Sequence, residues 1–103
     1  MTIFALIPAR GGSKGIARKN LKLISKIPLI AFSIIAAKKS LLVDRVIVSS
    51  EDEEIIRVAN NYGAETPFIR PNSLAKDNTK MIDVLKHAVN FLKNCNEKID
   101  AIV

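Results

Sequence analysis

Residues 10–20, called the glycine loop below, combine glycines with positive charge and contain no acidic side chain. These glycines and cations are Gly11, Gly12, Gly15, Arg10, Lys14, Arg18 and Lys19. Glycine lets a ligand approach the backbone closely because no Cβ is in the way. Adjacent backbone N–H groups and nearby cations together form an anion site, for which a polyphosphate is the usual ligand. The glycine loop therefore predicts phosphate binding.

The spacing of the glycines excludes two common phosphate-binding motifs. The phosphate loop of NTPases requires a second glycine five residues after Gly11, where this chain has Ile16. The dinucleotide fingerprint requires a glycine at the position of Ser13. A flexible basic loop without a ligand is the remaining alternative to a phosphate site.

Residues 7–20 resemble the N-terminal signature of the CMP-sialic acid synthetases, also called acylneuraminate cytidylyltransferases. The resemblance continues over nearly the whole chain, in residues 21, 28–30, 46–50, 62–65, 67–71, 74–77 and 83–85. It implies a Rossmann-like nucleotidyltransferase domain of about twice this length. Residues 1–103 are then expected to be its N-terminal, nucleotide-binding half.

The resemblance implies transfer of CMP from CTP to a nine-carbon sialic-type sugar acid, with release of pyrophosphate and the help of Mg²⁺. It places the Mg²⁺ ligands outside this chain and implies a homodimer for the full-length form. Two alternatives stay open. In the first alternative the acceptor is another sugar acid, such as pseudaminic or legionaminic acid. In the second the chain is a truncated, non-catalytic remnant that binds nucleotide.

The residue types of the glycine loop suit phosphoryl transfer, which requires positioning and neutralisation of charge more than covalent chemistry. Arg10 and Lys19 are the predicted catalytic residues, acting on the α-phosphate and the leaving pyrophosphate. The resemblance implies that Asn20 contacts the ribose or the base and that Arg70 lies near the cytosine. The complete predicted nucleotide site is Arg10, Gly11, Gly12, Ser13, Lys14, Lys19, Asn20, Arg70, Ala75 and Lys76.

Three positions depart from the pattern of the family. Residues 25–27, Ser-Lys-Ile, stand where a glycine is usual, so a tight turn must form there without glycine. Glu51 replaces a common aspartate, and Lys76 replaces a smaller polar residue. The acidic run 51–54 is expected to stabilise a helix start, facing away from the glycine loop, rather than to bind a metal.

The elements that position these residues alternate between strand and helix. Apolar runs predict strands at 3–7, 44–49, 66–69 and 100–103, with pairing of the first ending at Pro8. Helical spacing predicts a first helix at residues 28–40. A second helix is expected to begin at a capping box formed by Ser50 and Glu53 and to end at Gly63. A third is expected at residues 80–94, with Asn78 or Thr79 as its N-cap. The predicted buried faces are Leu29, Phe32, Ile35 and Ala36 in the first helix and Met81, Leu85, Ala88 and Leu92 in the last. This alternation predicts an α/β fold with a parallel sheet and helices on both faces.

Composition narrows the function further. The net charge of +6 equals the six basic residues between positions 10 and 26, which indicates one local anion site rather than a nucleic-acid surface. No apolar run is long enough to span a bilayer. The single cysteine, Cys95, cannot form a disulfide within the chain, which favours the reducing cytoplasm. His87 is expected on an exposed stripe of the last helix. Neither His87 nor Cys95 has a partner at metal-binding spacing.

Overall fold

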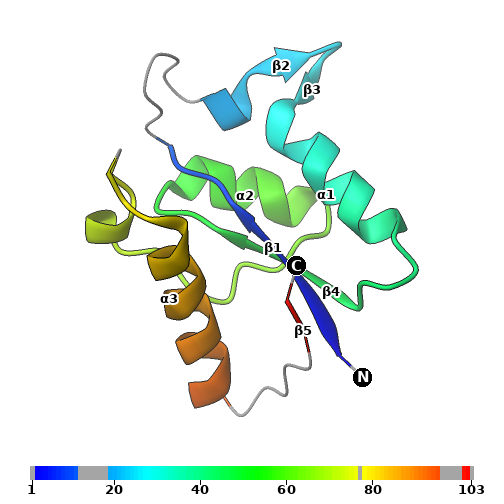
Figure 1. Cartoon of the computed structure of the whole chain (residues 1–103). Helices are drawn as coiled ribbons and strands as arrows, with labels where there is room; N and C mark the ends of the chain where they lie inside the picture. The colour runs from blue at the N-terminus through cyan, green and yellow to red at the C-terminus, as the bar shows by residue number, and fades with distance from the viewer. Residues whose placement is uncertain (1, 12–18, 77, 96–100, 103) are drawn as a thin grey trace.

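The protein is a parallel sheet with helices on both faces, seen in a computed structural model that describes residues 2–11, 19–76, 78–95 and 101–102 (Figure 1). In the described chain this sheet has the strand order β4-β1-β5, formed by β1 (Ile3–Pro8), β4 (Arg45–Ser49) and β5 (Ala101–Ile102). The central strand β1 pairs in parallel with both neighbours. The predicted α/β class is therefore confirmed, as is a strand within 100–103.

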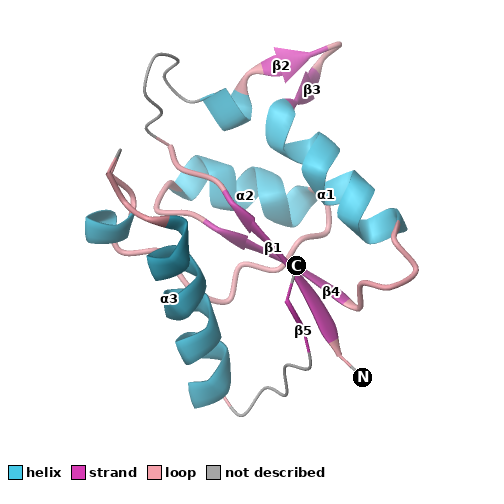
Figure 2. Ribbon diagram, in the orientation of Figure 1, coloured by secondary structure: helices cyan, strands magenta, loops and turns pink. Residues whose placement is uncertain are grey.

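Helices α1 (Leu29–Lys39) and α2 (Glu53–Asn61) cover one face of the sheet, and α3 (Met81–Asn94) covers the other (Figure 2). Successive side chains of a strand point to opposite faces. Ala5 accordingly packs in the layer of α1 and α2, while Phe4 packs in the layer of α3. Burial on both faces explains why β1 and β4 are apolar almost throughout.

Strand β1 extends one residue further than predicted. Pro8 pairs in register with Ser49, and the next N–H, that of Ala9, donates to the Ser49 carbonyl at 2.9 Å. N–H groups alternate in direction along a strand, so the N–H that Pro8 lacks would point away from β4. The ends of β1 and β4 therefore lie side by side, directly before the glycine loop and before Glu51.

The predicted buried face of α1 is wrong. Ile30, Ala31 and Ile34 are buried, whereas Phe32 is 41% exposed. Residues 29–37 are apolar at every position except Ser33, so periodicity could not identify the face. The chain enters α1 from a hairpin of β2 (Leu23–Ile24) and β3 (Ile27–Pro28).

The turn of this hairpin forms without glycine, as the sequence required. Ser25 and Lys26 both have positive φ, 52° and 69°. This is the backbone pattern of the two-residue turns that match the twist of paired strands. L-residues adopt it at a cost of about 1–2 kcal/mol each.

The predicted capping box of α2 is also wrong. The N-cap is Asp52, whose side chain accepts hydrogen bonds from the N–H groups of Glu54 at 2.9 Å and Ile55 at 3.2 Å. Ser50 lies two residues earlier, and its hydroxyl accepts from the Asp52 N–H. The prediction that Gly63 ends the helix is confirmed by its φ of 92°.

No strand forms at 66–69. The extended contact falls at Glu65, whose N–H and carbonyl bond to β4 as an isolated bridge, and Pro67 has no N–H to continue it. In α3 the buried residues are Val84, Ala88 and Leu92, so the predicted face is half right. Met81 is 61% exposed, and the N-cap is Lys80 without a side-chain bond, in place of Asn78 or Thr79.

Candidate functional site

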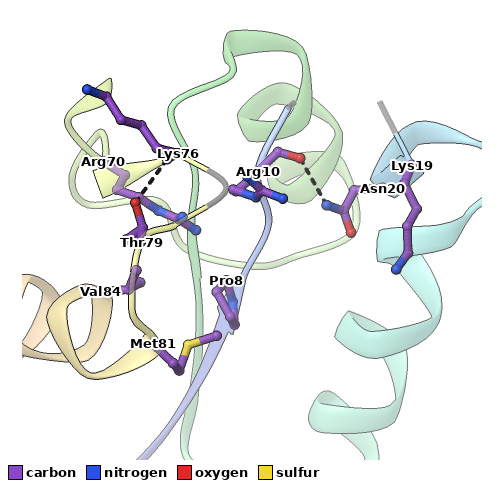
Figure 3. A pocket seen from close by; sticks show the side chains of 9 residues that line it. All are labelled: Pro8, Arg10, Lys19, Asn20, Arg70, Lys76, Thr79, Met81 and Val84. Atoms are coloured by element: carbon purple, nitrogen blue, oxygen red, sulfur yellow. Dashed lines mark hydrogen bonds between the residues drawn. The ribbon is translucent and has the colours of Figure 1, made fainter. Parts of the chain in front are cut away.

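A pocket of about 310 Å³ lies beyond the carboxyl end of β1 (Figure 3). Its walls come from the end of β1, the short 3-10 helix η1 (Lys19–Leu21), the loop after residue 69 and the start of α3. The lining residues are Pro8, Arg10, Lys19, Asn20, Arg70, Lys76, Thr79, Met81 and Val84. Ligands of open α/β sheets bind at this edge.

The lining of the pocket is strongly cationic. Among the residues that the structure describes, nine line the pocket; four of these are Arg or Lys, and none is acidic. The structure thus brings together five residues of the predicted site, namely Arg10, Lys19, Asn20, Arg70 and Lys76. Their separation in the sequence is large, but the carboxyl edge of the sheet places them around one cavity. A pocket with this charge favours a polyanion.

Arg70 forms the buried wall of the pocket, with only 2% of its surface exposed. Its Nε donates to the Ser49 hydroxyl at 3.1 Å, its Nη2 to the Ser49 carbonyl at 2.7 Å, and its Nη1 to the Leu74 carbonyl at 3.2 Å. The backbone N–H of Arg70 also donates to the Ser50 carbonyl at 2.9 Å. The guanidinium therefore fixes the loop 70–76 to the end of β4.

Burial lowers the pKa of Arg70, because desolvation disfavours its charged form. The carboxylate of Glu51 opposes this effect, and the positive charge of Arg10 adds to it. The guanidinium nevertheless stays protonated at neutral pH. Its three hydrogen-bond acceptors are a hydroxyl and two carbonyls, all of them uncharged. An anionic ligand in the pocket would compensate this buried charge.

Asn20 connects the two ends of the glycine loop. Its side-chain Nδ2 donates to the backbone carbonyl of Arg10 at 3.1 Å, as the dashed line in Figure 3 shows. The bond holds Lys19 and Arg10 on the same side of the pocket. Gly12, Ser13 and Lys14 lie outside the described residues.

Gly11 is buried against the acidic start of α2. Its N–H donates to the carboxylate of Glu51, through Oε1 and, at 3.3 Å, through Oε2. A Cβ on Gly11 would lie 2.9 Å from Cβ and 3.0 Å from Cγ of Asp52, closer than such atoms can pack. The expectation that residues 51–54 face away from the glycine loop is therefore wrong for Glu51 and Asp52. Sequence could not reveal this contact, because it joins residues 40 positions apart.

Of the two remaining predicted residues, Lys76 lies in a tight turn on the opposite wall and Ala75 lies outside the lining. The Lys76 N–H donates to the Thr79 hydroxyl and the Thr79 N–H to the Lys76 carbonyl, both at 3.0 Å. In Figure 3 the ammonium of Lys76 points away from Arg10 and Arg70. Ala75 follows the 3-10 helix η2 (Asn72–Leu74) and is half-buried, outside the lining.

Four lining residues were not predicted as site residues: Pro8, Thr79, Met81 and Val84. Thr79 and Met81 were interpreted as a helix cap and a core position, respectively. Both interpretations follow from local patterns, whereas their place in the pocket depends on how α3 docks. The only available signal was their proximity to the loop after Arg70.

The other candidate ligands do not form a metal site. His87 is half-buried, not exposed as expected, and packs edge-on against Phe68 with ring centroids 5.0 Å apart. Cys95 is exposed just after α3. Across the described part of the chain, no three His, Cys, Asp or Glu side chains are grouped so that they could hold a metal ion.

Known proteins resemble the chain over nearly its full length. The family model described as "Cytidylyltransferase" matches residues 4–99. The pseudaminic acid cytidylyltransferase of Campylobacter jejuni is 43% identical over 102 residues, which are 99% of this chain and 44% of that protein. The N-acylneuraminate cytidylyltransferase of Escherichia coli is 40% identical over 89 residues, which are 86% of this chain and 21% of that protein.

A solved structure shares the fold. It is that of a CMP:2-keto-3-deoxy-manno-octonic acid synthetase complexed with CTP, with a TM-score of 0.76 and 23% identity. The alignment covers 88% of this chain and 36% of that one. The Rossmann-like nucleotidyltransferase fold is thereby confirmed. The chain spans less than half the length of each of these proteins.

Proposed function

The chain belongs to the cytidylyltransferase family, and on that premise we propose that its cationic pocket binds CTP for transfer of CMP to a sialic-type nonulosonic acid. The observation that carries the proposal is the convergence of Arg10, Lys19 and Arg70 on one cavity whose described lining residues include no carboxylate. A triphosphate is the polyanion that this arrangement would neutralise.

The chemistry is an in-line displacement at the α-phosphorus of CTP. The anomeric hydroxyl oxygen of the sugar acid bonds to the α-phosphorus and loses its proton to solvent, while the bond from that phosphorus to the bridging oxygen breaks and pyrophosphate leaves with this oxygen. Arg10 offers planar paired donors to phosphate oxygens, and Lys19 offers a mobile point charge. The positive charges of both side chains stabilise the negative charge that develops on the phosphate oxygens during the displacement.

Mg²⁺ is part of the proposal as an ion that neutralises the nucleotide phosphates. It normally keeps several waters and takes one or two carboxylates in addition to substrate phosphates. Glu51 and Asp52 are the carboxylates beside Gly11, but Asp52 caps α2 and Glu51 bonds to Gly11. The described residues do not amount to a magnesium site, and we assign the ion no ligand among them.

The candidate acceptors are three sugar acids. Relatives at similar identity carry the names of enzymes for pseudaminic acid and for N-acylneuraminate. Pseudaminic and legionaminic acids therefore stay alternatives to a sialic acid. A nucleotide-binding remnant without transferase activity also stays an alternative.

The proposal is tested by measuring the release of pyrophosphate from CTP in the presence of Mg²⁺. N-acetylneuraminate, pseudaminate and legionaminate are supplied one at a time as acceptors. We expect release that depends on one of the sugar acids. In Lys19→Ala, kcat should fall by about 10²–10³, as for the loss of one preorganised donor. Lys22→Ala is the matched control, because Lys22 is exposed and outside the pocket lining. CTP binding without release under any condition would favour the remnant.

Self-association belongs to the proposal as well. Large apolar side chains are exposed at Leu23, Ile24, Phe32, Leu41, Leu42, Ile69, Met81 and Ile82. Exposed apolar side chains promote association, and analytical ultracentrifugation would detect a dimer or larger species.

A cytoplasmic location stays a prediction. No described helix is long and apolar enough to cross a membrane.

A further inference from the structure

Glu51 holds the backbone N–H of Gly11, at the point where the glycine loop begins. Both carboxylate oxygens accept from this N–H. Glu51 follows β4 and is half-buried, and its charge acts on Arg70 in the pocket wall. An internal carboxylate therefore occupies one of the donors that the glycine loop would offer to a phosphate.

A carboxylate resembles a phosphate group at such a donor. Both present charged oxygen acceptors, and hydrogen bonds to charged groups are about twice as strong as neutral ones. One N–H cannot donate a strong hydrogen bond to both groups together. A phosphate oxygen that binds Gly11 must therefore displace Glu51.

We propose that Glu51 is a built-in competitor of the nucleotide phosphates at the Gly11 N–H and thereby sets the affinity of the pocket for CTP. The inference rests on the proposed function, because it takes the triphosphate as the displacing ligand. Its consequence is that releasing Gly11 from Glu51 makes CTP bind more tightly. A residue that merely orders the glycine loop would have the opposite effect.

Two substitutions separate the hydrogen bond from the charge. Glu51→Asp keeps the charge but withdraws the carboxylate by one methylene from Gly11. Glu51→Gln keeps the length but removes the charge. Glu53→Gln is the control, because Glu53 is exposed on the same helix start. A general effect of charge would tighten CTP binding in Glu51→Gln and Glu53→Gln but leave Glu51→Asp unchanged.

The measurement is calorimetric titration of the 103-residue chain and its variants with CTP and with inorganic triphosphate, in EDTA. We expect both Glu51 variants to bind either ligand about three- to tenfold more tightly, which is the scale of one modest hydrogen bond. Glu53→Gln should match the wild type. Equal or weaker binding in Glu51→Asp would overturn the proposal.

Glycine-selective ¹⁵N labelling gives a second, direct readout. The chain has four glycines and so four glycine backbone amides. The Gly11 signal should move in Glu51→Asp and Glu51→Gln, and CTP should shift it in the wild type. A Gly11 signal that CTP leaves in place would also overturn the proposal.

The two ligands distinguish this inference from the proposed function. Triphosphate that binds more tightly to Glu51→Asp, together with no binding of CTP, would support the competitor and refute the nucleotide site. Equal affinity of CTP for the wild type and all variants would support the nucleotide site and refute Glu51 as a competitor. No binding of either ligand to any variant would refute both.

Discussion

The side-chain amide of Asn20 donates to the backbone carbonyl of Arg10 at 3.1 Å and joins the ends of the glycine loop beside the pocket. The sequence had assigned Asn20 to the ribose or base of the nucleotide. In the structure one of its two amide N–H groups donates to the protein backbone, and contact with the nucleotide stays a prediction. Asn20 therefore positions Arg10 and Lys19 relative to one another, whatever else it contacts.

Replacing Asn20 by Asp tests this connection. The two side chains have the same shape, but a carboxylate cannot donate and would repel the Arg10 carbonyl. We expect CTP affinity to fall about tenfold or more, the equivalent of one lost hydrogen bond and a new repulsion. Calorimetric titration with CTP measures the effect. Asn90→Asp is the control, because Asn90 is at an exposed position of α3; it should bind CTP nearly as the wild type does. Equal affinity of Asn20→Asp and Asn90→Asp for CTP would contradict the role of Asn20.

Gly11→Ala should destabilise the fold. Its new Cβ would collide with Asp52, whose side chain caps α2. Overpacking of this kind costs about 1–3 kcal/mol in the free energy of unfolding. Denaturation by urea measures it.

The partner of the collision can be identified by a double-mutant cycle. Asp52→Gly alone should cost only about a few tenths of a kcal/mol, because glycine is tolerated at an N-cap, and it removes every side-chain atom that Gly11→Ala would strike. The double variant should therefore be more stable than the sum of the two losses. Strict additivity would show that the strain at Gly11 comes from elsewhere.

Lys26→Gly should stabilise the hairpin of β2 and β3. Lys26 has a φ of 69°, which glycine adopts without steric cost. We expect a gain of about 0.5–1 kcal/mol in the free energy of unfolding, since relief of the backbone conformation outweighs the greater entropy of glycine in the unfolded chain. Lys22→Gly, at an exposed position outside the turn, should give no gain. A loss of stability in Lys26→Gly would contradict the turn geometry.

The ion pair between Arg45 and Glu65 should make stability depend on pH. A hydrogen bond from Arg45 holds the pKa of Glu65 below its ordinary value of 4.5. A carboxylate with a lowered pKa stabilises the fold above its unfolded pKa, and this contribution is lost as the pH falls through the folded value. Both side chains are partly exposed, so the contribution is at most about 1 kcal/mol.

The measurement is the free energy of unfolding of Glu65→Gln and the wild type between pH 7 and pH 3. The variant should be less stable at pH 7, and the difference should shrink once the pH falls below 4.5. Arg45→Gln should remove most of this pH dependence. A difference between Glu65→Gln and the wild type that stays constant down to pH 3 would contradict the pair.

Much of the fold could be predicted because its signals are local. The apolar run of β1, the glycine after α2 and the alternation of strand and helix each arise from neighbouring residues. The face of α1 could not be predicted, because its sequence is apolar all round and only docking against the sheet selects Ile30 and Ile34.

The site divides in the same way. Arg10 and Lys19 were predictable from one compact motif, and Arg70 from the resemblance of its surrounding segment. The contact of Glu51 with Gly11 was not predictable, because it depends on β1 and β4 ending side by side. Thr79 was assigned to a helix cap because threonine favours that position, yet its hydroxyl accepts from Lys76 across the turn.

Binding of CTP by the 103-residue chain tests the central claim most directly, with Arg10→Ala beside Arg57→Ala. Arg10 lines the pocket, whereas Arg57 is an exposed residue of α2 with the same charge. We expect CTP to bind the wild type and Arg57→Ala with similar affinity, and Arg10→Ala at least about tenfold more weakly, as for a lost charge-assisted hydrogen bond. Equal affinity in both variants, or no binding of CTP by the wild type, would contradict a nucleotide site at the carboxyl end of β1.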